Sequence, residues 1–202
     1  MAEATHDMFA ARAGVARHGA AGDPGVIVAP LPSAGIAYLV ARNGARAALG
    51  DAARAAFGVP LPPPAGSVRA GELALLWCGP DRWLAVATPA PAAGMAARLA
   101  AVAGLAAIIE HSHGTLLLRV GGRSVRDALA KGVAIDLHPR AFTVGQVALT
   151  AVAHIPLAIW QTGDEPRYVL LLPRSYAPSF ADWLSAAAAE FGLELAGAAS
   201  TP

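Results

Sequence analysis

The chain has 202 residues, of which 55% are hydrophobic, and a formal net charge of +1. This composition excludes a disordered chain, and the near-neutral charge gives no electrostatic basis for binding nucleic acid. Cys78 is the only cysteine, so an intrachain disulfide is excluded and a reducing compartment is expected. The first residues lack the apolar core of a signal peptide, and the alanine-rich run at 92–109 is poorly suited to a bilayer. We therefore expect a cytoplasmic protein without a membrane span.

The first half of the chain shows an alternation of strand and helix patterns. We expect a flexible N-terminal arm over residues 1–24, because this stretch is polar and glycine-rich. A first α+β lobe is expected over residues 25–112. Its elements are strand pieces at 26–29 and 35–40, a helix at 43–57, strands at 72–77 and 82–88, a helix at 91–102 and a strand at 105–111. This order is the βαββαβ plan of a ferredoxin-like lobe.

The second half repeats the same kind of pattern over residues 113–202. We expect a strand at 115–120, a helix at 124–131, an irregular loop, strands at 146–153, 156–161 and 167–172, a helix at 177–191 and a strand at 193–195. Residues 55–61 also resemble residues 189–195, since both are helix ends stopped by a glycine. The predicted fold is α+β, a two-lobed duplicated βαββαβ-like plait whose lobes share one core.

The most identifiable stretch runs from Glu110 to Thr150. Its apolar strand ends at Gly121-Gly122, where a turn with positive φ is expected. Ser124 is expected to cap the following helix, and Lys131 suits the negative end of that helix. Gly132 is expected to stop the helix, and Pro139 biases the preceding residue away from helix.

Three groups of residues in this region could carry chemistry. His111 and His113 lie two apart and could bind zinc together with His138 and His154, but no cysteine or carboxylate has ligand spacing. The segment 121–124 could bind an anion at a helix N-terminus, although a tight turn explains its glycines fully. In both cases the structural interpretation is favoured over the functional one.

The loop after the expected helix carries Asp136, His138, Arg140 and Phe142. An Asp–His pair could do acid–base chemistry, but no nucleophile or second base stands near it in the sequence. We predict that these four residues form a subunit contact or a structural loop. No catalytic residue is predicted, and Cys78 is expected to be unreactive because little positive charge surrounds it.

Several motifs resemble the gamma subunit family of heterotetrameric sarcosine oxidase. Residues 77–84, WCGPDRWL, resemble the family's LGPDEWL hairpin, and residues 124–146 resemble its signature through VRDALAKG and DLHPRAF. The segment 111–114 resembles its strand entry, and 174–177 with 183–184 resembles the start of its last helix. The matches follow one another in order from about residue 26 to 195. One position departs from the family, because Val133 stands where a cysteine often follows Lys-Gly.

The resemblance implies an aminomethyltransferase-like, folate-binding-like fold and a non-catalytic structural role. It implies a complex that oxidatively demethylates sarcosine to glycine, transfers the one-carbon unit to tetrahydrofolate and forms hydrogen peroxide. It further implies alpha, beta and delta subunits as partners, with FAD, FMN, NAD, tetrahydrofolate and zinc held there and no cofactor bound by this chain alone.

Two alternatives stay open from the sequence. The chain could be a free-standing folate-binding or small-ligand-binding module of the same fold. The complex could also act on another N-methyl amine, which nothing in this chain would reveal.

Overall fold

The computed structural model describes residues 17–31, 35–88 and 92–196. The chain divides into two compact units. The described residues of the large-sheet unit are 17–31, 114–144 and 148–196, and those of the small-sheet unit are 35–88, 92–113 and 145–147. No helix within the described residues has the length and apolarity to cross a membrane.

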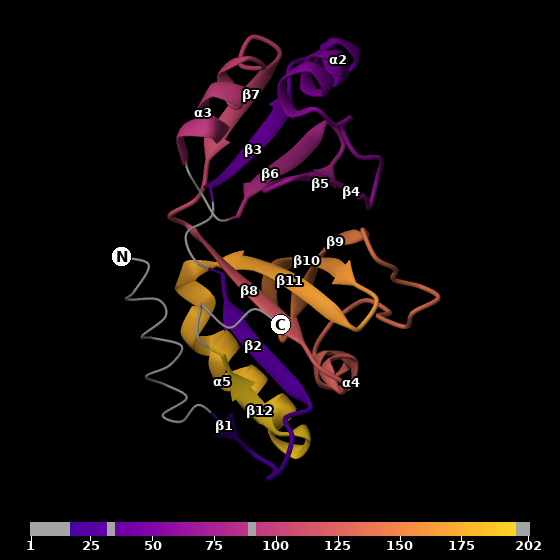
Figure 1. The fold of residues 1–202 in the computed structure, drawn as a ribbon, viewed down its shortest axis with the longest axis vertical. Coiled ribbons are helices and arrows are strands. Elements are labelled where there is room, and N and C mark those ends of the chain that lie inside the picture. Colours follow the sequence, from indigo (N-terminus) through magenta and orange to yellow (C-terminus); the bar gives the residue numbers. More distant parts are fainter. Residues whose placement is uncertain (1–16, 32–34, 89–91, 197–202) are drawn as a thin grey trace. The chain divides into compact units, whose positions relative to one another are not determined.

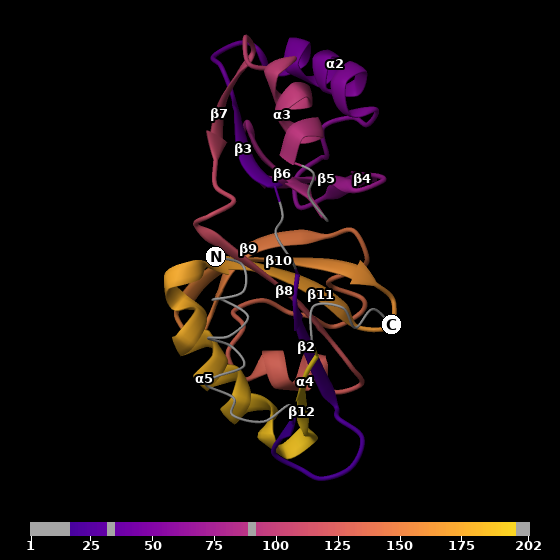
Figure 2. The same ribbon diagram turned by 60° about the vertical axis from the view of Figure 1, so that its left-hand side comes forward.

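The small-sheet unit has the ferredoxin-like plan that the sequence predicted (Figure 1). Its elements are β3 (Gly35–Ala41), α2 (Arg46–Phe57), β4 (Ser67–Ala70), β5 (Leu73–Gly79), β6 (Arg82–Ala87), α3 (Ala92–Ala100) and β7 (Ala106–Glu110). The sheet order is β4-β5-β6-β3-β7, and every neighbouring pair is antiparallel. The edge strand β4 was not predicted, because its sequence SVRA alternates polar and apolar residues over only four positions, the shortest run that indicates a strand. Figure 2 shows α2 and α3 on one face of this sheet.

The large-sheet unit contains both chain ends of the described structure. Its elements are β1 (Arg17–His18), β2 (Val26–Pro30), β8 (Thr115–Gly121), α4 (Val125–Ala130), β9 (Val147–Val152), β10 (Ile155–Gly163), β11 (Arg167–Pro173), η1 (Arg174–Tyr176), α5 (Ala177–Ala188), η2 (Ala189–Phe191) and β12 (Leu193–Leu195). The sheet order is β1-β12-β2-β8-β11-β10-β9. All the elements predicted for 115–195 are present, with shifted ends.

The two sheets repeat one strand order, which confirms the predicted duplication. If β1 and β2 are left out, the large sheet has the order β12-β8-β11-β10-β9, which matches β7-β3-β6-β5-β4 of the small sheet. In this match α4 corresponds to α2 and α5 to α3. The similar segments 55–61 and 189–195 therefore end non-equivalent helices, and they are no trace of the duplication.

Strand β2 is inserted into the repeated order between β8 and β12. It pairs antiparallel with β8 and parallel with β12. The order of elements along the chain predicts that residues 26–29 belong to the first lobe, together with the elements that follow them. The structure places β2 in the other unit, since Val26 and Val28 are buried in the cluster that includes Leu118 and Leu193.

Each unit has its own cluster of buried hydrophobic residues, where the sequence analysis expected one shared core. In the small-sheet unit, Leu49 and Phe57 of α2 and Leu99 of α3 pack on Leu39 and Trp83 of the sheet. In the large-sheet unit, α4 and α5 pack on one face of the sheet through residues such as Leu129, Phe180 and Leu184. The apolar positions of each helix follow its 3.6-residue period, which is why the helices cover these faces.

The last part of the expected N-terminal arm, residues 17–25, is hydrogen-bonded to residues 189–194 near the C-terminus. Residues 1–16 of this arm lie outside the described residues. Backbone N–H groups of Ala20 and Gly25 donate to the carbonyl oxygens of Ala189 and Phe191, both at 2.7 Å. Arg17 also forms an ion pair with Glu194 at 2.8 Å. Residues 17–25 are therefore held against η2 and β12 by these bonds.

The end of α4 is fastened to α5 by Lys131 and Gly132. The Lys131 ammonium donates to the carbonyl oxygen of Ala187 and to the Glu190 carboxylate, and lies 4.7 Å from the Phe191 ring centroid. Gly132 follows the helix as predicted, but a Cβ there would lie 2.7 Å from the Trp183 ring. Close packing against Trp183 therefore requires glycine at this position.

Replacement of Gly132 by alanine should destabilise the protein, because the added methyl group overlaps the Trp183 ring. We expect a loss of about 1–3 kcal/mol in the free energy of unfolding, measured by urea denaturation. Gly50→Ala is the matched control, since nothing lies within 4 Å of a Cβ at this position of α2. That control should be neutral or stabilising by about 0.5–1 kcal/mol. Equal effects of the two substitutions would contradict the packing argument.

Candidate functional site

The loop that follows α4 is anchored by two buried apolar side chains. Leu137 and Phe142 are 5% and 6% exposed, and both belong to the core of the large-sheet unit. The Phe142 ring lies 6.4 Å from the Tyr168 ring, centroid to centroid. The residues between the anchors are exposed, so the loop is held at both ends and projects between them.

Side chains of this loop also bind its own backbone. The Asp136 carboxylate accepts a hydrogen bond from the backbone N–H of His138 at 2.8 Å. The imidazole Nδ1 of His138 accepts from the backbone N–H of Arg140 at 3.2 Å. The His138 carbonyl oxygen accepts from the N–H groups of Ala141 and Phe142 at 2.8 and 2.9 Å. These local bonds replace secondary structure in the loop, as short polar side chains often do in turns.

This geometry separates the four residues that the sequence analysis grouped. Asp136 and His138 each bind a backbone N–H group, so these contacts do not form the Asp–His pair of a general acid–base site. Phe142 is a core residue. Arg140 is exposed like Asp136 and His138, but its guanidinium has no hydrogen bond or ion pair to any residue that the structure describes.

A partly buried Arg–Tyr contact lies next to this loop and was not predicted. Arg126 Nε in α4 donates to the hydroxyl of Tyr168 in β11 at 3.0 Å. Burial raises the pKa of the Tyr168 hydroxyl, and the neighbouring Arg126 opposes this shift. Nothing in the sequence marks this pair, because the two residues are 42 positions apart.

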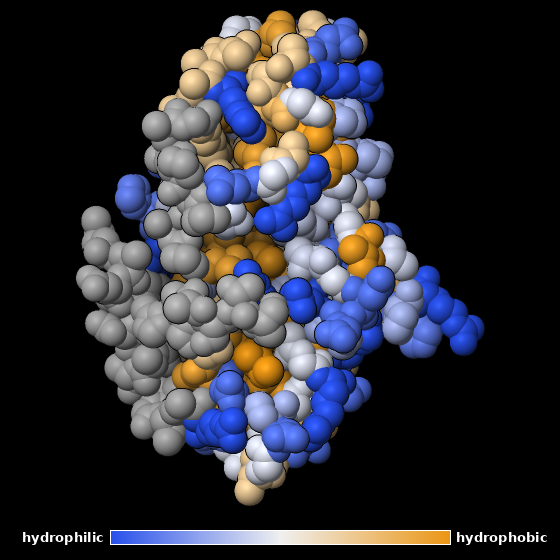
Figure 3. All heavy atoms as spheres, viewed as in Figure 1, coloured by the Kyte–Doolittle hydropathy of each residue, from blue (hydrophilic) through white to orange (hydrophobic). Residues whose placement is uncertain are grey.

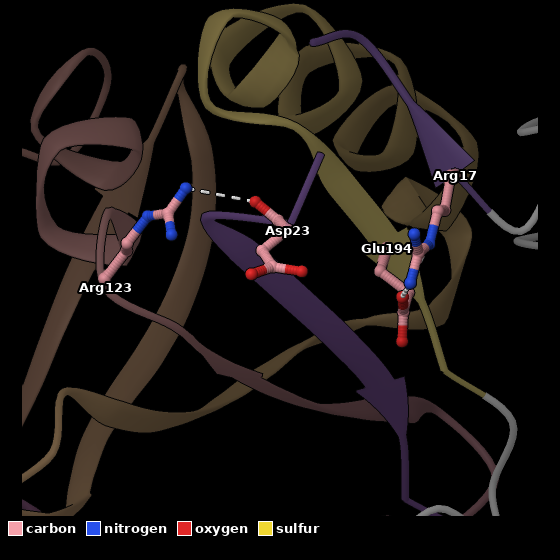
Figure 4. A network of polar contacts seen from close by, with 4 residues as sticks. All are labelled: Arg17, Asp23, Arg123 and Glu194. Carbon is pink, nitrogen blue, oxygen red and sulfur yellow. Dashed lines mark hydrogen bonds and ion pairs between the residues drawn. The ribbon is translucent and has the colours of Figure 1, made fainter. Parts of the chain in front are cut away.

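The turn at 121–124 packs against the entry to β2 (Figure 4). Gly122 has φ 108°, as expected for the turn, and a Cβ there would lie 2.4 Å from the Gly25 carbonyl oxygen. The same oxygen accepts from Ser124 N–H at 2.9 Å, and the Arg123 guanidinium donates to the Asp23 carbonyl oxygen at 3.1 Å. Ser124 stands at the N-cap position without a side-chain cap. Its N–H group is thus committed to the chain rather than available to an anion.

The histidines considered as metal ligands belong to different units, His111 and His113 to the small-sheet unit and His138 and His154 to the large-sheet unit. The His111 ring lies edge-on to Tyr38 at 5.5 Å, and the adjacent Ser112 hydroxyl accepts from the backbone N–H of Ile36 at 2.8 Å. Hydrogen bonds from Ser112 lower the pKa of the Glu110 carboxyl. His154 lies in the turn between β9 and β10 with φ 67°. Among the described residues, no cluster of three or more His, Cys, Asp or Glu could hold a metal ion.

Cys78 is buried in β5 of the small-sheet unit. Burial raises the pKa of its thiol to about 11, and the charge of Arg82 opposes this shift only in part. The thiolate is the reactive form of cysteine, so this environment suppresses nucleophilic chemistry at neutral pH.

Truncation of Phe142 to alanine should destabilise the protein by about 3–5 kcal/mol, because it removes a buried aromatic ring from the core. Arg140→Ala is the matched control from the same loop. We expect it to change stability by less than about 0.5 kcal/mol, because the side chain is exposed. Thermal or urea unfolding of both variants measures the difference. A large loss of stability in Arg140→Ala would show that Arg140 braces the loop.

The Cys78 thiol should react slowly with Ellman's reagent in the native protein at pH 8, because it is buried and protonated. The rate should rise sharply in denaturant. The thiol's folded pKa is raised, so its contribution to stability is complete below pH about 9 and is lost as the pH rises towards 11. A Cys78→Ala variant should therefore lose less stability than the wild type over this alkaline range. Fast labelling of the native protein would contradict this assignment.

Comparison with known proteins gives one consistent family. A profile described as "Sarcosine oxidase, gamma subunit family" matches residues 42–190. A curated sarcosine oxidase subunit gamma from Arthrobacter sp is 37% identical over 157 residues, which cover 73% of this chain and 75% of that relative. The subunit of the same name from Corynebacterium sp. (strain P-1) is 37% identical over 158 residues, with coverages of 75% and 73%.

Solved structures agree with the sequence relatives. A chain of heterotetrameric sarcosine oxidase from Corynebacterium sp. U-96, in complex with pyrrole 2-carboxylate, matches with a TM-score of 0.79 and 28% identity, covering 100% of this chain and 98% of that one. The aminomethyltransferase T of the glycine cleavage system from Bartonella henselae matches with a TM-score of 0.62 and 16% identity, covering 85% of this chain and 48% of that one, and so shares the fold. The chain belongs to the sarcosine oxidase gamma subunit family.

Proposed function

We propose that this chain is the gamma subunit of a heterotetrameric sarcosine oxidase and assembles in the cytoplasm with alpha, beta and delta subunits. The observation that carries the proposal is the similarity to a chain of the Corynebacterium sp. U-96 enzyme, which covers 100% of this chain and 98% of that one. The curated gamma subunits support the same assignment at higher identity over about three quarters of the chain.

The proposed complex oxidatively demethylates sarcosine to glycine, passes the one-carbon unit to tetrahydrofolate and reduces oxygen to hydrogen peroxide. FAD, FMN, NAD, tetrahydrofolate and zinc would be held by the partner subunits. This chain would contribute to sarcosine catabolism and one-carbon metabolism as a part of that assembly.

The role that we infer for the chain itself is structural. Three features of its recognisable motifs support this role. Asp136 and His138 bind backbone groups of their own loop, and the turn at 121–124 bonds to the entry of β2. Cys78, in the other recognisable motif, is buried with a raised pKa. Each motif is thus explained by folding requirements.

The likeness to aminomethyltransferase T is a likeness of fold at 16% identity. It does not favour the alternative of a free-standing folate-binding module, and no other observation does so.

The assignment predicts that the tagged chain, captured from lysate of its native cells, brings down two larger flavin-bearing chains and a small fourth chain. Mass spectrometry identifies the chains, and an absorbance scan detects the flavin. An unrelated protein with the same tag is the control. Recovery of the chain alone and colourless would contradict the proposal, and titration with tetrahydrofolate would then test the alternative.

A further inference from the structure

Strand β7 forms one edge of the small sheet, and the outer side of its backbone is open. In an antiparallel pair, residues whose backbone groups bond to the neighbouring strand alternate with residues whose groups point away from it. The His111 N–H donates to the Ile36 carbonyl oxygen, so the odd-numbered residues of this segment bond to β3. The N–H and carbonyl groups of Ile108 and Glu110 therefore point outward, and they have no backbone partner among the residues that the structure describes.

One face of β7 is apolar and exposed. Ile108 packs against the cluster that contains α2 and α3, so its neighbours Ala107 and Ile109 lie on the other face of the sheet. Strand register places Ile109 beside Tyr38 and Ala107 beside Val40. Ala107 is exposed and Ile109 is 52% exposed, whereas Tyr38 and Val40 are half-buried. The register thus gathers these four side chains into one apolar surface at the edge of the sheet.

The position of this edge is visible in the figures. Figure 2 shows β7 at the free edge of the small sheet, beyond β3, and no other described strand of this sheet lies outside it. In Figure 3, tan and orange residues form much of the surface at the upper left, where Figure 1 shows α3 and β7.

Two of the other edge strands in the described structure are protected against foreign strands. Native proteins shorten their edge strands, place charges on them or cover them, because an open edge invites pairing with another chain. Strand β1 consists of only two residues, Arg17 and His18, both polar. Strand β4 has four residues, and Arg69 within it is charged and exposed.

Strand β9, the remaining edge strand of the large sheet, is covered at both ends. The Val147 N–H donates to the Ala65 carbonyl oxygen, and the Ala151 carbonyl oxygen accepts from the Ala134 N–H. Strand β7 has no comparable protection among the described residues, and its only charged residue is Glu110 at its end. An apolar, open edge of this kind is expected to be covered by another strand.

The charge at the end of β7 indicates which kind of strand fits. The exposed Glu110 carboxylate accepts from the Ser112 N–H at 3.0 Å, and no ion pair with a lysine or arginine is found for it among the described residues. A basic side chain on the added strand would complement it. A second copy of β7 would not, because antiparallel pairing centred on Ile108 places Glu110 opposite Ala106 of the copy.

We propose that β7 accepts a strand from another subunit of the complex, an extended segment with apolar side chains over Ala107 and Ile109 and a basic side chain beside Glu110. The outward backbone groups of Ile108 and Glu110 bond to this strand, which continues the five-stranded small sheet. In such strand addition the main-chain bonds supply affinity, and the alternating side chains supply specificity. This inference rests on the proposed function, because that function supplies the partner chain.

A competition experiment tests the inference in the assembled complex. The wild-type chain and one variant are co-expressed with the other subunits, and the complex is isolated through a tag on one of those subunits. Mass spectrometry compares the ratio of variant to wild type in the complex with the ratio in the lysate. Ile109→Lys should be depleted by about 30-fold or more, because the added strand would desolvate the unpaired ammonium group.

Leu149→Lys is the matched control for the introduced charge. Leu149 is 56% exposed and lies on β9, an edge strand whose ends are already bonded. This variant should enter the complex like the wild type.

Two variants at Glu110 separate backbone pairing from side-chain contact. Glu110→Pro removes the outward N–H and should be depleted by about 10-fold or more, because proline cannot donate to an added strand. Glu110→Gln keeps the N–H and an acceptor for Ser112. Its depletion should be smaller, since exposed charge pairs contribute little. Equal incorporation of these two variants would overturn strand addition.

The remaining outcomes also decide the inference. Depletion of Ile109→Lys supports it if the thermal midpoint equals that of the wild type; if the midpoint falls, Ala107→Lys at the exposed neighbouring position replaces this variant. Incorporation equal to that of Leu149→Lys overturns the inference and leaves the proposed function standing. A change in self-association without a change in incorporation also overturns it, since a second copy would then occupy β7. Failure of the wild-type chain to enter any complex removes the proposed function and, with it, this inference.

Discussion

Strand β8 is the element on which the large-sheet unit depends, because it has a partner strand on each side. It pairs with β11 from Thr115 to Gly121 and with β2 from Leu118 to Gly121. At its end, the Gly122 backbone approaches Gly25 so closely that a side chain would not fit. The chain then enters α4, whose last residues fasten α5. One continuous segment, 115–132, thereby orders the N-terminal strand, a β-hairpin and the C-terminal helix.

Local patterns were sufficient to predict most of this fold. Apolar runs, glycine stops and turn residues predicted the strands and helices of both halves, and their order predicted the ferredoxin-like plan. The partner of β2 could not be predicted in this way, because strand pairing depends on contacts between residues far apart in sequence. Residues 26–30 have the same apolar pattern whichever sheet they join. The short strand β4 was missed for a different reason, since its alternation of polar and apolar residues extends over only four positions.

The sequence identified the loop at 136–142 as a distinct segment but did not predict the role of each residue in it. Alternation of polar residues suggested that Asp136, His138 and Arg140 share one role. In the structure the first two bind backbone groups, and the third projects outward. Hydrogen bonds between side chain and backbone within a few residues depend on φ and ψ values that an irregular sequence does not specify. The Arg126–Tyr168 contact could not be predicted for the same reason as the pairing of β2, because it joins a helix to a strand that is distant in the sequence.

Because the residues of the loop at 136–142 have different roles, substitutions of them should affect the proposed complex in different ways. Phe142 and Asp136 determine whether the loop keeps its conformation, through core packing and a backbone hydrogen bond respectively. The Arg140 guanidinium forms no hydrogen bond or ion pair with the described residues, so it does not help to hold that conformation. Substitutions of the first kind should therefore lower stability and assembly together, whereas those of the second kind should lower assembly alone. This distinction separates a docking residue from a bracing residue even where both belong to one short motif.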